Sequence, residues 1–145
     1  MTIEINPIIR SQMLNQAERC FPQESCGFIL GVITGPDSAI GTYYYPCENQ
    51  KQANRQRRFL IDPDIYQLVE DTADANGLAI VSIVHSHPNH PDQPSEFDKQ
   101  HAWPGLSYII VSVYEGQVRG YRSWRLADDR TEFHQETIEP GGAKS

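Results

Sequence analysis

The chain has 145 residues, of which 39% are hydrophobic and 21% charged, and its formal net charge is −7. This length and apolar content predict one globular domain rather than a disordered chain. The acidic balance argues against a nucleic-acid partner, because neutralising phosphates requires concentrated Lys and Arg. The longest apolar run, Leu78 to Val84, is far shorter than the roughly 20 residues of a membrane helix, so we expect no membrane partner either.

Two features at the level of the whole chain indicate a cytoplasmic protein. Residues 1–6 contain an acidic residue and no continuous apolar stretch, unlike a signal peptide. The three cysteines, Cys20, Cys26 and Cys47, are odd in number and lack CxxC spacing, which fits neither a disulfide framework nor a structural zinc ribbon. We therefore expect reduced thiols in the cytoplasm.

Helices and strands alternate in the predicted first half of the chain. Pro7 suits the first turn of a helix, and apolar residues recur after it at helical spacing. Two β-branched or aromatic runs around a Gly-Pro-Asp-Ser turn then predict a hairpin. The expected elements are a helix over 7–20, strands over 27–34 and 39–46, a polar loop over 48–56 and a short strand over 57–61.

The second half begins with a helix from Asp62-Pro63 to about Asn76. The run Leu78 to Val84 lacks alternation, which predicts a central strand buried on both faces. Three prolines then indicate an irregular loop. A short helix and three strands follow, over 95–102, 107–113, 117–126 and 131–138.

This order of elements predicts an α/β fold in which a mixed β-sheet is flanked by helices. The sequence contains no internal repeat or linker. We therefore expect residues 1–138 to form a single domain and residues 139–145 a flexible C-terminal tail.

Four of the five histidines fall within seventeen residues, which places the candidate chemistry there. His85-Ser86-His87 follows the buried strand, and the two-residue period of a strand places both imidazoles on one side if the strand continues. A catalytic zinc takes three protein ligands, and the third is sometimes a carboxylate. Asp98, in the first turn of the short helix, is the natural candidate.

Two further residues suit the remaining steps of a metal-assisted hydrolysis. Glu24 stands before an apolar strand, and a carboxylate near a metal can move a proton from water to a leaving amine. Ser95 offers a hydroxyl to a developing oxyanion. Glu24 has the alternative of a surface salt bridge. Ser95 and Asp98 also match a capping box, which either positions the helix while Asp98 faces the metal or draws Asp98 away from it.

Together these residues resemble the pattern of the JAMM (MPN-plus) metalloproteases. That pattern is a distant Glu, then His-x-His, seven residues, Ser, two residues and Asp, and every position is filled here by Glu24, His85, His87, Ser95 and Asp98. The resemblance implies that His85, His87 and Asp98 are zinc ligands. It also implies that Glu24 is the general acid and base and that Ser95 stabilises the tetrahedral intermediate.

The resemblance covers roughly residues 7–126 and includes the segments Glu24 to Gly31 and Phe59 to Pro63. It implies a fold similar to cytidine deaminases, although the His-x-Glu and Pro-Cys-x-x-Cys of deaminase chemistry are missing. It also implies a zinc-dependent metallo(iso)peptidase. Small stand-alone prokaryotic members are associated with ubiquitin-like or sulfur-carrier proteins, so we expect cleavage at or near a C-terminal Gly-Gly tail.

Several residues and one other class of function remain open. The alternative to an enzyme is a non-catalytic MPN-type scaffold for protein interaction, although such members usually lack the ligands. The basic segment Lys51 to Arg58 is either a solvated loop or a contact for an acidic substrate. His90 and His101 are expected at the surface or beside the ligands. Trp103 and Trp124 are expected to pack, or Trp103 to wall a substrate groove.

Overall fold

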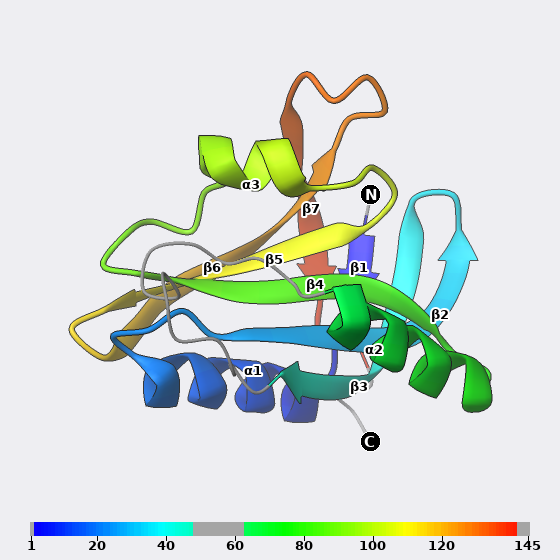
Figure 1. Ribbon diagram of the computed structural model, residues 1–145, viewed down its shortest axis with the longest axis horizontal. Helices are drawn as coiled ribbons and strands as arrows, with labels where there is room; N and C mark the ends of the chain where they lie inside the picture. The colour runs from blue at the N-terminus through cyan, green and yellow to red at the C-terminus, as the bar shows by residue number, and fades with distance from the viewer. Residues whose placement is uncertain (1, 48–62, 142–145) are drawn as a thin grey trace.

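The computed structural model describes residues 2–47 and 63–141, in which strands and helices alternate (Figure 1). The helix over 7–20 and the hairpin lie where the sequence predicts them. The elements are β1 (Thr2–Glu4), α1 (Pro7–Cys20), β2 (Cys26–Gly35), β3 (Ser38–Cys47), α2 (Pro63–Ala75), β4 (Ala79–Pro88), α3 (Glu96–His101), β5 (Ser107–Tyr114), β6 (Gln117–Leu126) and β7 (Phe133–Glu139).

The strands form one mixed sheet that closes on itself in the order β1-β3-β2-β4-β5-β6-β7. The closure depends on β1, which pairs in parallel with β3 on one side and β7 on the other. Its central residue, Ile3, is fully buried. The prediction of a mixed sheet with flanking helices is confirmed, but the sequence did not indicate β1 or the closure, because three residues are too few to show a strand period.

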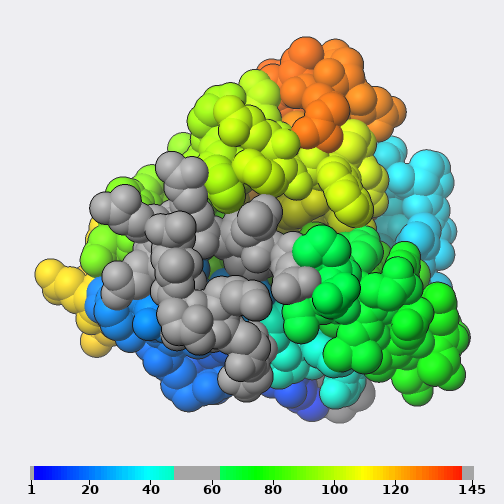
Figure 2. Space-filling view, in the orientation of Figure 1, coloured from blue at the N-terminus to red at the C-terminus, as the bar shows by residue number. Residues whose placement is uncertain are grey.

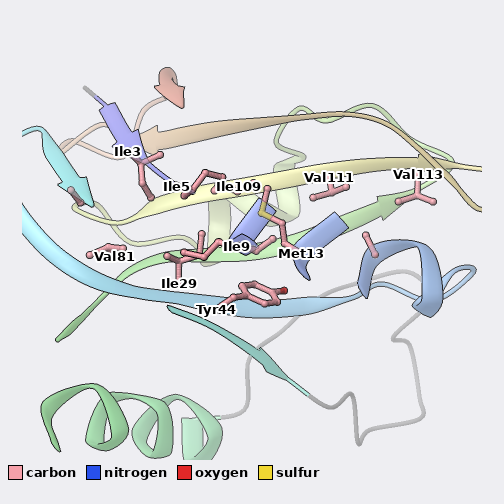
Figure 3. Close-up of a cluster of buried hydrophobic side chains, with 13 residues drawn as sticks. Ile3, Ile5, Ile9, Met13, Ile29, Tyr44, Val81, Ile109, Val111 and Val113 are labelled. Carbon is pink, nitrogen blue, oxygen red and sulfur yellow. The ribbon is translucent and has the colours of Figure 1, made fainter. Parts of the chain in front are cut away.

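The helices α1 and α2 pack on opposite faces of β2 and β4, which follows from the alternation of side chains along a strand. On one face Ile9 and Met13 of α1 pack in a cluster that includes Ile29 of β2, as Figure 3 shows. On the other face Phe28 of β2 packs in a cluster with Val69 of α2. The central strand β4 is therefore covered on both sides, as the lack of alternation in its apolar run predicts.

Several strands extend beyond the expected residues. β4 continues to Pro88 instead of ending at Val84, and β7 ends at Glu139, one residue inside the expected tail. The expected strand over 57–61 and the basic segment Lys51 to Arg58 lie outside the described residues. Among the residues that are described, the helices are too short or too polar to cross a bilayer.

The core on the α1 face gives a stability test. Met13 is 1% exposed and packs in the α1 cluster, so Met13→Ala should lower the free energy of unfolding by about 2–5 kcal/mol. Ile8, one turn away on the same helix, is 69% exposed, and Ile8→Ala should change it by less than about 0.5 kcal/mol. Urea denaturation of both variants checks this; equal losses would contradict the assigned face of α1.

Candidate metal centre and active site

The continuation of β4 beyond its apolar run presents two imidazoles on one face of the sheet. His85 is 3% exposed and His87 9% exposed, and their Nε2 atoms lie 3.2 Å apart. His85 sits between Cys26 of β2 and Ile110 of β5 in the ladder, so the strand that carries it is held on both sides. The backbone that carries His85 is therefore held by both neighbouring strands, and that of His87 by β5.

Asp98 of α3 brings a carboxylate to the same point. Its Oδ1 lies 3.3 Å from Nε2 of His85, and its Oδ2 lies 3.1 Å from Nε2 of His87. One ligand atom from each of the three residues lies within 4.8 Å of the others, and no other such group of three occurs in residues 2–47 and 63–141. Two imidazole nitrogens and a carboxylate are a donor set of catalytic zinc sites, so these residues fit that ion.

A backbone carbonyl sets the orientation of His87. Nδ1 of His87 lies 2.9 Å from the carbonyl oxygen of Pro91, which only accepts hydrogen bonds. Nδ1 therefore carries a proton, and Nε2, which faces His85 and Asp98, is the nitrogen left to bind a metal once the ring is neutral. The loop that supplies Pro91 is tied to β6, because Nε1 of Trp124 donates to the carbonyl of Asp92 at 3.0 Å.

The charges of the three groups respond to burial and to each other. Burial lowers the pKa of His85. For His87 burial also lowers the pKa, but the hydrogen bond and charge of Asp98 reverse this and leave the pKa raised. Although burial raises it, the pKa of Asp98 is held well below its usual range by hydrogen bonds from both histidines. Asp98 is therefore ionised at neutral pH, the form in which a carboxylate binds a metal.

The capping box expected at α3 does form, and it does not remove Asp98 from the cluster. The backbone N–H of Asp98 donates to Oγ of Ser95 at 3.1 Å, and the N–H of Ser95 donates to Oδ2 of Asp98 at 2.8 Å. The same carboxylate faces both histidines. The two roles therefore coexist in this structure, because a carboxylate oxygen accepts from more than one direction, and the alternative in which the cap draws Asp98 away from the histidines is wrong.

Glu24 is held next to the histidines by a contact that the sequence did not indicate. The N–H of Ser25 donates to Oγ of Ser86 at 2.8 Å, and the N–H of Ser86 donates to the carbonyl of Ser25 at 3.1 Å. Ser86 is fully buried between His85 and His87. The residue between the two imidazoles thus fixes the backbone directly after Glu24, and its only sequence signal is a small polar residue in a buried strand.

The environment of Glu24 suits proton transfer. Its side chain is 7% exposed, so the alternative of a surface salt bridge is wrong. Desolvation by burial raises its pKa from 4.5 to about 7, while His87 lowers it and Asp98 raises it by their charges. A carboxyl that titrates near neutral pH both accepts and returns a proton readily.

A cavity of about 380 Å³ opens beside the three ligand residues. Its walls include His85 and Asp98, and the rest is largely aromatic. Trp103 is 57% exposed, and its ring centre lies 5.7 Å from that of Tyr66 in an edge-to-face contact. The other aromatic residues of the wall are Phe97, His101 and Tyr108.

The remaining candidates lie outside the ligand cluster. His101 is exposed, and its Nδ1 donates to the carbonyl of Phe97 at 2.9 Å. His90 is exposed as well, and its carbonyl accepts from Oγ of Ser112 at 2.7 Å. Trp124 anchors the loop of Asp92, whereas Trp103 walls the cavity, as one of the two expectations had it.

Comparison with known proteins decides the family. Residues 7–127 match the family of prokaryotic homologs of the JAB domain. The chain belongs to this family. It is similar to the tail tip assembly protein K of Escherichia phage N15, with 35% identity over 100 residues, 68% of this chain and 36% of that protein. It is also similar to a desampylase of Haloferax volcanii, with 30% identity over 92 residues, 63% of either chain.

Two solution structures have the same fold as the JAB domain described here. Protein DSY2949 of Desulfitobacterium hafniense aligns with a TM-score of 0.80 at 29% identity, over 94% of this chain and 90% of that one. A protein of Salinibacter ruber aligns with a TM-score of 0.75 at 35% identity, over 96% and 92%. The chain thus spans about a third of the phage protein and less than two thirds of the desampylase, but nearly all of both solved structures.

The raised pKa of Glu24 predicts a pH dependence of stability in the metal-free protein. A carboxyl whose pKa is higher folded than unfolded makes the protein less stable as pH rises from 4.5 to 7. Wild type should therefore lose up to about 3 kcal/mol of unfolding free energy relative to Glu24→Gln across this range. Urea denaturation with a chelator present measures the difference.

An exposed carboxyl provides the control for this measurement. Glu70 lies on the exposed side of α2, so Glu70→Gln should keep the pH profile of wild type. A constant difference between wild type and Glu24→Gln at all pH values would show that the environment of Glu24 does not oppose its ionisation.

Proposed function

We propose that the chain is a zinc-dependent metallo(iso)peptidase that hydrolyses an amide bond at or near the C-terminal Gly-Gly tail of a small ubiquitin-like or sulfur-carrier protein. The observation that carries this proposal is the convergence of His85, His87 and Asp98 beside the buried carboxyl of Glu24. The similarity to a desampylase supports an isopeptidase acting on ubiquitin-like conjugates.

In the proposed reaction the three metal ligands, Glu24 and Ser95 have separate roles. His85, His87 and Asp98 hold the zinc, which when bound supplies a Lewis acid for the scissile carbonyl and the attacking water. Glu24 accepts a proton from the water as its oxygen bonds to the carbonyl carbon, and returns that proton to the leaving amine as the C–N bond breaks. The hydroxyl of Ser95 donates to the carbonyl oxygen as negative charge develops there.

The cavity beside the ligands supports a tail-like substrate. A Gly-Gly segment has no side chains to prevent close approach to His85 and Asp98. The aromatic walls around Trp103 then suit an apolar side chain of the tail next to the glycines. The basic segment Lys51 to Arg58, proposed to contact an acidic partner, lies outside the described residues.

The alternative is a non-catalytic scaffold. The phage relative is named for tail tip assembly, so the JAB domain also occurs in a protein named for an assembly role. The complete set of Glu24, His85, His87, Ser95 and Asp98 favours catalysis, because a scaffold has no need of it. The cytoplasmic location and the likeness to cytidine deaminases that the sequence indicated remain predictions.

The decisive experiment combines metal content with cleavage. Purified protein should bind about one zinc per chain, and Glu24→Gln should keep the zinc but lose hydrolysis by about 10²- to 10⁴-fold. The substrate is a sulfur-carrier protein extended by one residue beyond Gly-Gly, and mass spectrometry detects the released residue. Asp98→Asn should weaken zinc binding as well as hydrolysis.

The outcomes separate the two functions. Full hydrolysis by Glu24→Gln would remove Glu24 from the mechanism. Zinc-loaded wild type that cleaves none of the extended carriers, but binds one equally well without metal, would favour the scaffold.

The cavity gives a prediction on substrate affinity. Trp103→Ala removes the exposed indole but keeps the backbone N–H that donates to the hydroxyl of Tyr108 at 2.9 Å. We expect KM for a carrier substrate to rise about tenfold with kcat nearly unchanged, because the ring contacts the tail before and during reaction alike. Tyr43 is a similarly exposed aromatic residue on β3, and Tyr43→Ala should leave KM unchanged. Equal KM values for Trp103→Ala and wild type would exclude this cavity as the tail site.

A further inference from the structure

The helix that carries Asp98 is short and lies at the surface. α3 has six residues, and none of them is buried. A helix of this length is unstable by itself, since isolated helices shorter than about 12 residues are marginal in water. Its N-terminus is fixed by the capping box of Ser95 and Asp98. Its C-terminus needs a second attachment if Asp98 is to stay aimed at His85 and His87.

Arg130, from the turn between β6 and β7, supplies this attachment. Its Nη1 donates to the carbonyl of Ala102 at 2.7 Å, and its Nη2 donates to the carbonyls of Lys99 and Gln100 at 3.4 and 3.3 Å. These carbonyls belong to the last turn of α3 and the residue that caps it, and such groups have no partner inside a helix. A guanidinium suits them because it offers several donors in a rigid plane and a positive charge at the negative end of the helix.

The turn itself presents Arg130 in a fixed conformation. The φ angle of Arg130 is 63°, a left-handed value that a non-glycine residue adopts at some cost. Oδ1 of Asp129 accepts hydrogen bonds from the N–H and the hydroxyl of Thr131, at 3.0 and 2.6 Å, and the N–H of Arg130 donates to Ala127 at 2.8 Å. The turn and α3 lie side by side in Figures 1 and 2.

We propose that Arg130 is a positioning residue of the metal centre: it fixes the C-terminal end of α3 and thereby the direction of the Asp98 carboxylate. The helix is then attached at both ends, by Ser95 at the first and Arg130 at the last. This inference rests on the proposed metal site, and it assigns a role there to a side chain that touches none of the three ligands.

Metal binding tests the proposal without any assay of hydrolysis. Arg130→Gly removes the guanidinium while keeping the left-handed backbone at no steric cost. It should lower zinc affinity by about 10- to 100-fold, measured by competition with a chelator. The visible absorption bands of the Co²⁺-substituted protein should change as well, because they report the ligand geometry. Arg130→Lys retains a cationic donor and should recover part of both effects.

Controls separate positioning from general stability. Arg10 is exposed on α1, so Arg10→Gln matches Arg130→Gln in the charge removed and should keep the affinity and spectrum of wild type. Wild-type zinc affinity and Co²⁺ bands in both Arg130→Gly and Arg130→Gln would overturn the proposal. Wild type that binds no zinc would overturn the metal site and this role together, whereas zinc binding without hydrolysis would affect only the proposed reaction.

Discussion

The candidate site depends on the burial of β4. β4 lies between β2 and β5 as far as His85, continues beside β5 to Pro88, and is covered by α1 and α2 on its two faces. His85 and His87 therefore keep the orientation that the strand period gives them. The buried hydroxyl of Ser86 accepts a hydrogen bond from the N–H of Ser25 and so also fixes the backbone next to Glu24. Two ligands and the proposed base thus derive their positions from one stretch of core.

Asp98, the third proposed ligand, is positioned by a surface helix and not by a buried strand. Asp98 comes from a short surface helix with no buried residue, and hydrogen bonds from Ser95 and Arg130 attach its two ends. Net hydrogen-bond contributions are individually small, of order 1 kcal/mol, so the orientation of Asp98 depends on several of them together. The candidate centre accordingly has one half on a central strand of the sheet and the other on α3, which hydrogen bonds attach at its two ends.

The sequence predicted the parts of this arrangement that depend on local pattern. Helical spacing located α1, and the apolar run located β4 and the common face of His85 and His87. The closure of the sheet could not be predicted from the sequence, because β1 is too short to show the period of a strand. The roles of Ser86 and Arg130 were not predicted for another reason. Their hydrogen-bond partners lie 61 and roughly 30 residues away in the sequence, and no local pattern indicates a contact across such a separation. Loop residues that support a site are visible only once the fold brings them there.

One oxygen of Asp98 serves two structures at once. Its Oδ2 accepts from the N–H of Ser95 and lies 3.1 Å from Nε2 of His87. Helix formation and ligand orientation are therefore coupled equilibria, and coupling of this kind is reciprocal. At the proposed metal site, a substitution that stabilises α3 in this conformation should strengthen metal binding, and metal binding should stabilise α3. The metal affinity of the proposed centre is then open to adjustment from the outer surface of a six-residue helix, with His85, His87 and Asp98 unchanged.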